Sequence, residues 1–590
     1  MRRVTPIFVF NSLNTQRGGL TKAVLTRANT LSDHFDSVHF FTLKFQRNHR
    51  EIIDKLYQSN ALDARVQTYN MFLDLDPFKE ESAVDGAAAY GATPNERGRY
   101  APVDVTPHGD RTASPMGVTP DTGERAVSRT TTCEGKQTTA AEITLAQLGA
   151  NGIVKIEDKK APSLSYRCYR NGLYVHYERF DENGQLAFID YFNENRHRLR
   201  REEFNEQGDL VRIRHMDLVT NKPSLDRYFS RNGSCYLTTW LDSKTGKVGR
   251  CILLQPTTRE FGSFNDLCSF WITQKVASIP HAVLMSDARD TDAIVLNVEN
   301  TTVKRVAVLH NNHFDEPFTM GAPVRGRWKT LLRNFDRFER IVFLTREQLT
   351  DFQQQFGAHD NFCVIPHSVP TIAVRLHEHP HEPDDYHPHL VVTLARYVKQ
   401  KRLDEAIQAF RHVVQRVPEA RYEIYGFGEE EKALKQLIKK LKLEKHVRLM
   451  GFTRDAAAVY RRAACSVLTS DFEGFGLSLT ESLAVGTPVV AYQSKYGPLD
   501  IVRDGVDGYL VPKGEQKLLA NKIVRILRKP ALREKLSRNA VAANERFSVE
   551  KYRQQWLSLI AEVAPAPETE TGAKAGTEAE SRVTPRMRAQ

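Results

Sequence analysis

Two carboxylates with seven residues between them flank a glycine-rich segment that could bind a hydroxyl-rich ligand. The segment runs from Asp471 to Glu481, follows an apolar run and begins a helical pattern. Glycine lets a ligand approach the backbone, and the free N–H groups at a helix start suit a phosphate. We expect one of Glu473 and Glu481 near a sugar and the other near a ribose, unless Glu473 caps the helix and Glu481 faces solvent. The residues between them are further ligand-contact candidates: Gly474, Phe475, Gly476 and Leu477.

Two histidines follow another predicted strand. His310 comes directly after Arg305–Leu309, and His313 lies three residues further on. This spacing would suit a metal pair, but the sequence shows no third cluster of ligand residues, so we expect no metal here. Either histidine could instead be structural. His310 is the first candidate for a ligand contact because it stands at the end of the strand, and His313 is the second.

The elements that must hold these residues form an alternating pattern of strands and helices. Strands separated by helices build right-handed βαβ units and a parallel sheet, and ligands bind at the carboxyl ends of its strands. In the second half of the chain the predicted strands are Leu390–Leu394, Arg421–Tyr425, His446–Leu449, Cys465–Leu468 and Pro488–Tyr492. The predicted helices are Leu403–Val417, Glu429–Leu443, Ala456–Ala463 and Leu477–Ala484.

The same α/β pattern occurs, interrupted, in the first half of the chain. Strand Ile7–Phe10 leads through a loop containing Gly18 and Gly19 into helix Thr21–Leu31, and Ser37–Leu43 is a second strand. The pattern returns after Phe261, where the predicted strands are His281–Leu284, Ala293–Val298 and Arg305–Leu309. The interruption indicates an insertion into the first α/β domain.

The inserted region contains a repeat of turn dipeptides, spaced about 12 residues apart, between aromatic and β-branched runs. The dipeptides are Asn171-Gly172, Asn183-Gly184, Asn195-Arg196, Gln207-Gly208, Asn221-Lys222, Asn232-Gly233 and Thr245-Gly246. One strand and one turn per period predict an up-and-down antiparallel meander. Such a sheet is either a structural insert or a platform for oligomerisation or acceptor binding.

Composition sets the remaining boundaries. From Asp76 to Lys136 there is no Leu, Ile or Trp, so this stretch cannot bury enough apolar surface to offset its ordering entropy. We therefore expect a first domain at 1–75 and 261–370, a disordered insert at 76–160 and a meander at 161–260. A second α/β domain with a closing helix is expected at 371–563, followed by a disordered tail at 564–590.

Charge and cysteine content restrict the setting and the partners. The 590 residues carry a formal charge of +11, which favours a phosphate-rich polymer, nucleic acid or an acidic membrane face. No apolar run reaches the roughly 20 residues of a membrane span, and the start lacks a signal-peptide pattern. Seven scattered cysteines without a CxxC pair suggest free thiols. We expect a cytoplasmic protein that can contact the inner face of the membrane.

Glu473 and Glu481, ahead of Ala484–Val490, resemble the Glu-x7-Glu motif of retaining GT-B glycosyltransferases of family four, and the resemblance extends to Ala395–Arg402. It implies an α/β fold of two Rossmann-like domains facing a cleft, with the meander inserted in the first, and a nucleotide-sugar donor. On this resemblance Arg396 and Lys401 bind the donor diphosphate, and the Gly18–Gly19 segment is the glycine loop of the first domain. His310, or second His313, touches the donor sugar.

Three features resemble the wall teichoic acid poly(glycerol-phosphate) and poly(ribitol-phosphate) α-glycosyltransferases: the opening Ser12–Ala23, the inserted meander and the segment Lys495–Gly505. The resemblance implies transfer of glucose or N-acetylglucosamine from a UDP-sugar to an anionic polyol-phosphate polymer. It also implies a trimer formed through the meander. Protein cations would neutralise the diphosphate, so neither a cofactor nor an obligatory metal is expected.

Other functions remain open at this point. The related transferases that place N-acetylglucosamine on Ser/Thr-rich adhesins carry a similar β insertion and work with a partner subunit. A non-catalytic GT-B scaffold is a further alternative, although the chain retains Glu473, Glu481, Arg396 and Lys401. Nucleic-acid binding is disfavoured because no arm, finger or RNA-binding aromatic motif is present.

Overall fold

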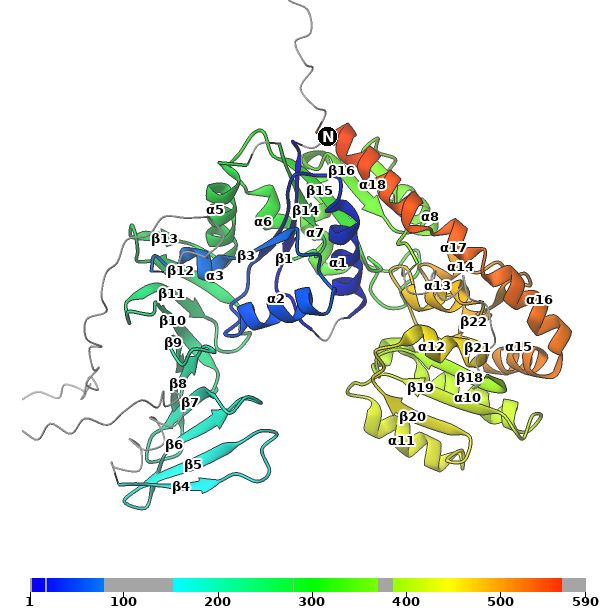
Figure 1. The fold of residues 1–590 in the computed structure, drawn as a ribbon, viewed down its shortest axis with the longest axis horizontal. Helices are drawn as coiled ribbons and strands as arrows, with labels where there is room; N and C mark the ends of the chain where they lie inside the picture. The colour runs from blue at the N-terminus through cyan, green and yellow to red at the C-terminus, as the bar shows by residue number, and fades with distance from the viewer. Residues whose placement is uncertain (1–2, 16–17, 79–151, 280, 370–385, 565–590) are drawn as a thin grey trace, which may run out of the picture.

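The computed structural model describes residues 3–15, 18–78, 152–279, 281–369 and 386–564. These residues form two parallel sheets of seven and six strands and one sheet of ten strands (Figure 1). Helices cover the parallel sheets, and the ten-stranded sheet extends from the first of them. The expected α/β architecture of two Rossmann-like domains with an antiparallel meander inserted in the first, the GT-B fold, is confirmed.

The first domain is built on a sheet of order β17-β16-β15-β14-β1-β2-β3, in which every pairing is parallel. Every residue of the interior strand β1 is buried, as expected of a sheet covered on both faces. The strands are β1 (Thr5–Phe10), β2 (Val38–Thr42), β3 (Val66–Asn70), β14 (Ala282–Ser286), β15 (Lys304–Leu309), β16 (Arg340–Phe343) and β17 (Phe362–Val364). The helices are α1 (Gly19–Leu31), α2 (His49–Gln58), α3 (Met71–Leu75), α5 (Phe264–Val276), α6 (Asp292–Leu296), α7 (Lys329–Leu332) and α8 (Arg346–Phe356).

One element of this domain differs from the prediction. The run Ala293–Val298, expected as a strand, lies mostly in the short helix α6. Its residues Ile294, Val295 and Leu296 are buried, and the Val295 amide donates to the Thr291 carbonyl at 3.0 Å. The periodicity of a short apolar run is the same in a buried strand and in a buried helical turn. The strand was predicted from the β-branched residues of the run, and that prediction is wrong.

The inserted meander is a sheet in which each strand pairs antiparallel with the next along the chain. All seven predicted turn dipeptides lie between consecutive strands, with a positive φ in each, for example +79° at Gly172. The strands are β4 (Ile153–Glu157), β5 (Ser165–Arg170), β6 (Leu173–Phe180), β7 (Leu186–Phe192), β8 (Arg198–Phe204), β9 (Leu210–Met216), β10 (Pro223–Phe229), β11 (Cys235–Leu241), β12 (Val248–Leu253) and β13 (Arg259–Phe261).

The meander begins earlier than predicted. Strand β4 lies inside the region 76–160, which we expected to be disordered, and it pairs with β5 from Ile153 to Glu157. The error arose because the apolar Ile-Val-Lys-Ile run is short and follows a long polar stretch. Residues 76–78 are also described, and the Ser230 hydroxyl donates to Asp76 at 2.5 Å. The rest of the expected insert and nearly all of the expected tail lie outside the described residues.

The second domain has the strand order β20-β19-β18-β21-β22-β23, again with parallel pairings. Its strands are β18 (His387–Leu394), β19 (Arg421–Tyr425), β20 (Val447–Gly451), β21 (Ala463–Leu468), β22 (Val489–Tyr492) and β23 (Gly508–Val511). Its helices are α10 (Leu403–Val414), α11 (Glu431–Lys440), α12 (Ala456–Arg461), α13 (Leu477–Ala484), α14 (Pro498–Ile501), α15 (Gln516–Arg528), α16 (Pro530–Ala540) and α17 (Ala543–Arg546). The predicted elements agree within a few residues at their ends.

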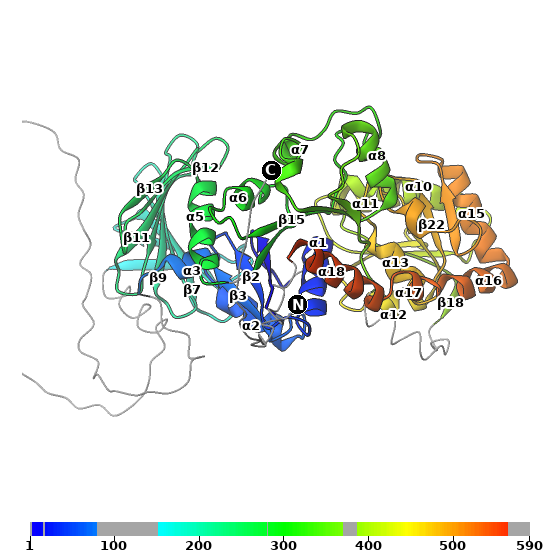
Figure 2. The ribbon, with the colours of Figure 1, turned by 90° about the horizontal axis from the view of Figure 1, so that it is seen from above.

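The last described helix, α18 (Val549–Val563), returns to the first domain and lies beside α1 in both views (Figures 1 and 2). Trp556 of α18 is buried, and the Arg27 guanidinium of α1 lies over its ring at 4.5 Å. One apolar core therefore contains side chains of α1, α13 and α18. This shared core joins the two domains at the base of their interface.

The helices and cysteines of the described residues can be compared with two further predictions. None of the described helices is long and apolar enough to cross a membrane. The six described cysteines are all free thiols, as expected from the absence of a CxxC pattern.

Candidate functional site

The loops that follow β18 and β21 meet at the carboxyl edge of the second sheet. Lys401 Nζ lies 2.5 Å from Glu473 Oε1, and the Ser470 hydroxyl donates to the same oxygen at 2.6 Å. The Gln400 side chain donates to the Phe472 carbonyl at 2.8 Å and fixes one loop against the other. The parallel sheet places these residues together because it aligns the carboxyl ends of its strands.

Arg396 stands in the same loop as Lys401 but is exposed to solvent. Within the described ranges no ion pair engages its guanidinium. An exposed guanidinium in a loop at the carboxyl edge of a sheet is suited to an anionic ligand, and its planar fork matches a phosphate.

A glycine pair that the sequence analysis did not single out shapes this loop. Gly426 and Gly428 follow β19, and a Cβ on them would lie 1.9 Å from the Ala395 carbonyl oxygen and 2.3 Å from that of Tyr397. Only glycine allows the two loops to approach so closely. In the sequence, this close approach is indicated by the Gly-x-Gly pattern directly after the predicted strand Arg421–Tyr425.

The glycines of the segment from Asp471 to Glu481 allow the two domains to come into contact. A Cβ on Gly474 would lie 1.9 Å from the carbonyl oxygen of His310, which belongs to the first domain. Gly476, with a φ of +94°, precedes α13 as its N-cap, so Glu473 is not the cap. Gly19 faces Leu477 across the interface, since a Cβ on this glycine would lie 3.8 Å from the leucine Cδ1. Gly18, the N-cap of α1, is exposed.

Glu481 takes part in a contact between the domains. Its carboxylate forms an ion pair with Lys22, which lies in the first turns of α1 just after the glycine loop. The Glu481 side chain is 13% exposed, so it is not an ordinary surface residue of α13. The two carboxylates Glu473 and Glu481 are thus each neutralised by a lysine, one from each domain.

His310 is held by a buried carboxylate. Its Nε2 lies 2.6 Å from Asp287 Oδ1, and Arg27 Nη2 lies 2.5 Å from both oxygens of the same carboxylate. Burial acts to raise the pKa of Asp287, but Arg27 and His310 hold that pKa below its usual value. Burial lowers the pKa of His310, although Asp287 opposes this effect. A neutral His310 that donates from Nε2 leaves Nδ1 as an acceptor.

Two aromatic contacts complete the surroundings of His310. His367, which the sequence analysis did not select, stacks on the His310 ring with a centroid distance of 5.3 Å. Phe475 of the second domain meets His367 edge to face, also at 5.3 Å. No sequence pattern marked His367, because its role depends on packing between segments that are distant in the chain.

His313, the second histidine candidate, occupies an aromatic cluster. Its ring centroid lies 4.0 Å from that of Phe314 and 5.9 Å from that of Tyr496, with which it is stacked. Burial lowers its pKa to about 4. These contacts make His313 a neutral packing residue, and they do not place it beside Glu473 or Lys401.

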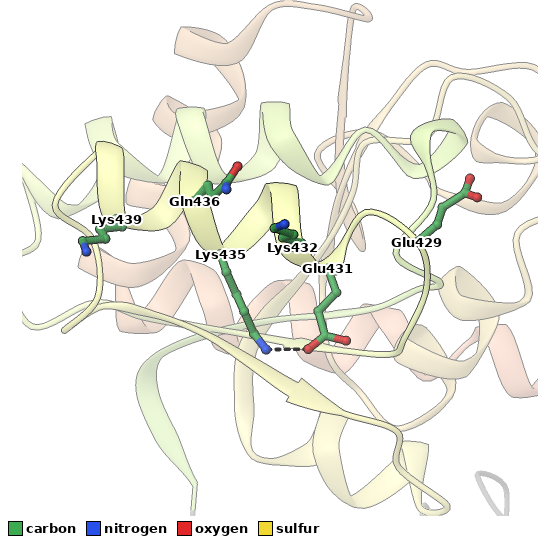
Figure 3. Close-up of a pocket in the computed structure, with 6 residues that line it drawn as sticks. All are labelled: Glu429, Glu431, Lys432, Lys435, Gln436 and Lys439. Atoms are coloured by element: carbon green, nitrogen blue, oxygen red, sulfur yellow. Dashed lines mark hydrogen bonds and ion pairs between the residues drawn. The ribbon is translucent and has the colours of Figure 1, made fainter. Parts of the chain in front are cut away.

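A surface hollow elsewhere in the second domain has a different character (Figure 3). It lies along α11 and is lined by Glu429, Glu431, Lys432, Lys435, Gln436 and Lys439. Within it, Lys435 Nζ pairs with Glu431 Oε1 at 2.6 Å, an ordinary pair one helical turn apart. Apart from Glu429, the lining residues stand on the helix α11 and not at the carboxyl ends of the strands, so we place the functional site at the domain interface.

Several known proteins are similar to this chain in sequence. Residues 377–542 match the family described as glycosyl transferases group 1. A poly(glycerol-phosphate) alpha-glucosyltransferase of Bacillus subtilis is 25% identical over 567 residues, covering 94% of this chain and 74% of that protein. A poly(ribitol-phosphate) alpha-N-acetylglucosaminyltransferase of Staphylococcus aureus is 23% identical and covers 93% and 98%.

Solved structures share the fold. The crystal structure of TarM superposes with a TM-score of 0.73 at 21% identity, covering 94% of this chain and 98% of that one. The pneumococcal O-GlcNAc transferase GtfA gives a TM-score of 0.60 at 16% identity and covers 96% and 100%. The chain is therefore a glycosyltransferase with the GT-B fold, which carries a glycosyl transferases group 1 domain and resembles the poly(glycerol-phosphate) and poly(ribitol-phosphate) α-glycosyltransferases over nearly its whole length.

Proposed function

We propose that this enzyme transfers glucose or N-acetylglucosamine from a UDP-sugar to a polyol-phosphate polymer of the wall teichoic acid type, with retention of the anomeric configuration. The observation that carries the proposal is the 2.5 Å contact between Lys401 and Glu473, made from the loop after β18 that also carries the exposed Arg396. It joins a diphosphate-binding cation to a sugar-binding carboxylate at the interface of two nucleotide-binding folds.

The cations supply the chemistry of the leaving group. Cleavage of the donor bond develops negative charge on the diphosphate, and fixed positive charges stabilise that charge in the transition state. Arg396 and Lys401 would bind the diphosphate, with the N-terminal turns of α1 on the opposite side. When Lys401 turns to the phosphate, Glu473 is released to accept hydrogen bonds from sugar hydroxyls.

The other site residues hold the rest of the donor. Glu481 would bind the ribose hydroxyls once Lys22 is displaced from it, and Nδ1 of the neutral His310 would accept a hydrogen bond from the sugar. The acceptor hydroxyl attacks from the face that the diphosphate leaves, and its proton passes to the leaving diphosphate oxygen. Because protein cations neutralise the diphosphate, transfer should not require a metal and should persist in EDTA.

Several observations favour a polyol-phosphate acceptor. The two long relatives are named for transfer to poly(glycerol-phosphate) and poly(ribitol-phosphate), and a S. aureus TarM variant was solved with UDP and alpha-GlcNAc-glycerol. The formal charge of +11 suits a polymer with one negative charge per repeat. We propose a cytoplasmic homotrimer formed through the meander, with peripheral contact to the membrane.

A protein acceptor is the second candidate. A GtfA subunit of Streptococcus gordonii, named as a UDP-N-acetylglucosamine–peptide transferase, is 25% identical but covers only 43% of this chain. The polymer relatives cover more than nine-tenths of this chain, and on that ground the polyol-phosphate acceptor is preferred.

Radiolabelled UDP-glucose and UDP-N-acetylglucosamine, each offered with poly(glycerol-phosphate), poly(ribitol-phosphate) or a Ser/Thr-rich peptide, test the proposal. We expect transfer to one polymer and none to the peptide. Lys401→Ala should reduce kcat by at least the ~10²-fold typical of a lost charge-stabilising group. Lys435→Ala, in the hollow on α11, is the matched control and should leave kcat unchanged. Transfer to the peptide alone, or full activity of Lys401→Ala, would refute the proposal.

A further inference from the structure

A buried group of three metal-ligand side chains lies in the meander, away from the transferase site. Cys168 of β5 stands directly across the strand pair from His176 of β6, and Glu178 lies two residues further along β6. One ligand atom from each side chain lies within 4.8 Å of the other two. The exposed fractions of these residues are 0%, 5% and 0%. Residues i and i+2 of a strand share a face, so the sheet itself brings the three together.

The cluster already holds one cation. Lys155 of β4 reaches over from the neighbouring strand, and its Nζ lies 2.8 Å from Glu178 Oε2. His176 Nε2 lies 3.0 Å from the other oxygen of the same carboxylate. A fully buried carboxylate requires a compensating positive charge, because desolvation of an unpaired ion is costly. Lys155 therefore neutralises Glu178 in the form described here.

We propose that Cys168, His176 and Glu178 bind one divalent transition-metal ion of the Zn²⁺ class, in exchange for the ammonium group of Lys155. Thiolate, imidazole and carboxylate are the three ligand types of protein zinc sites. A soft thiolate beside an imidazole disfavours Mg²⁺ and Ca²⁺, which prefer oxygen ligands. Three protein ligands leave one tetrahedral position for water.

Charge balance makes the exchange reasonable. With Lys155 bound, its ammonium group and the Glu178 carboxylate cancel, and Cys168 is present as the thiol, because burial raises the pKa of its sulfur. With the metal bound, its two positive charges cancel the carboxylate and the Cys168 thiolate. The bond between sulfur and hydrogen breaks, one proton passes to solvent, and a bond between sulfur and the metal forms. The Lys155 side chain is 14% exposed, so its ammonium group can move outward into water.

The expected consequence is local stabilisation of the meander. The metal would join β5 to β6 next to β4, the strand at the edge of the sheet. A ligand that binds only the folded state raises the unfolding temperature by mass action. The site does not contact Lys401, Glu473 or His310, so loading it should leave glycosyl transfer unchanged.

Titration of the full-length, chelator-treated protein with Co²⁺ tests the site, because a thiolate–cobalt charge-transfer band reports the sulfur ligand specifically. We expect one equivalent of this band in the native protein and its loss in Cys168→Ser. Cys251→Ser is the matched control, since Cys251 is also buried in the meander but stands outside the cluster; it should keep the band. Bound Zn²⁺ should displace the cobalt and raise the unfolding temperature.

Lys155→Met separates metal binding from a purely structural ion-pair network. Removal of the competing ammonium should tighten Co²⁺ binding at least tenfold and make the unfolding temperature of the variant strongly dependent on Zn²⁺. Far-UV circular dichroism establishes that each variant is folded. The proposal is overturned if the folded native protein and Lys155→Met show no thiolate–cobalt band, or if Cys168→Ser retains it.

Discussion

Glu473 and His310 come from different domains, and each is held in place by one neighbouring side chain. Lys401 fixes Glu473, and Asp287 fixes the His310 ring through Nε2. Arg27 in turn keeps Asp287 ionised within the protein. These partners set the orientation of the two side chains before a substrate binds, so donor binding requires only that Lys401 exchanges the Glu473 carboxylate for the donor phosphate.

Asp287→Asn should impair catalysis through His310. The amide can no longer accept the Nε2–H bond as a charged group, so the ring tautomer and orientation become less defined. We expect kcat to fall by about 10- to 100-fold, by analogy with other groups that orient a functional histidine, with a smaller change in KM. Initial rates over a range of UDP-sugar concentrations measure both constants.

His310→Asn provides the control for that experiment. If Asp287 acts through His310, the double variant that carries both Asp287→Asn and His310→Asn should be no slower than His310→Asn alone. The effects of two substitutions on activity do not add when the residues act together. Additive losses would show instead that Asp287 serves the enzyme in another way. Replacement of Asp287 leaves Arg27 without its carboxylate partner and lowers the stability of the protein. Activities are therefore compared at equal concentrations of folded protein.

Gly474→Ala should damage both stability and activity. The added Cβ would lie 1.9 Å from the His310 carbonyl oxygen, and backbone on both sides would have to move. Overpacking of this kind costs about 1–3 kcal/mol, and it separates Glu473 from His310. Thermal unfolding and transfer rates measure the two effects. Gly326→Ala, where a Cβ meets nothing within 4 Å, should leave both unchanged.

At the scale of elements, α8 is fixed at its start by a residue of the other domain. Asp500 accepts hydrogen bonds from the amides of Arg346 and Glu347 at 3.1 and 3.2 Å. Burial raises the pKa of the Glu347 side chain to about 7, and the neighbouring Asp351 and Asp500 act in the same direction. Lys495 opposes them from 3.8 Å. This carboxyl group therefore gains its proton near neutral pH.

Glu347→Gln should remove a pH dependence of stability. The folded state keeps the Glu347 proton up to a pKa of about 7, while the unfolded chain releases it near 4.5. Stability thus falls as the pH rises from about 4.5 to 7. The variant should be more stable than the native protein at pH 8, by about 1–3 kcal/mol, and equal to it below the lower value.

Urea unfolding at pH values on both sides of this window measures the effect. Exposed Glu534, paired with Arg538 one turn away on α16, offers the control Glu534→Gln, which should follow the native pH profile. An unchanged slope in Glu347→Gln would show that this carboxyl group does not control the pH response of the domain interface.

The sequence predicted most elements because their patterns are local. Alternating strands and helices located the second sheet, and turn dipeptides located the strands from β5 to β12. Two local patterns were ambiguous. The apolar residues of α6 imitate a strand, and β4 is recognisable only through its pairing with β5. Each error concerns a short apolar run whose structure depends on its three-dimensional neighbours.

At the scale of the whole molecule, the site is assembled from segments that are far apart in the chain. Lys22 and Glu481 are 459 residues apart, and Arg27 and Asp287 are 260 apart. The resemblance implied roles for Glu481 and His310. No sequence pattern paired Glu481 with Lys22, or His310 with Asp287 and His367. Asp287 and His310 meet because they follow the adjacent parallel strands β14 and β15 of the first domain. Lys22 reaches Glu481 across the domain interface, where α1, α13 and α18 share one core (Figure 1).

In the mechanism proposed above, a single nucleotide-diphosphate site lies at the domain interface. A crystal structure of this protein with bound UDP would locate that site. We predict the diphosphate between Arg396 and Lys401, with the ribose hydroxyls on Glu481 in place of Lys22. UDP bound elsewhere, for example in the hollow along α11, or with Lys22 still paired to Glu481 and no contact to Arg396 or Lys401, would contradict it.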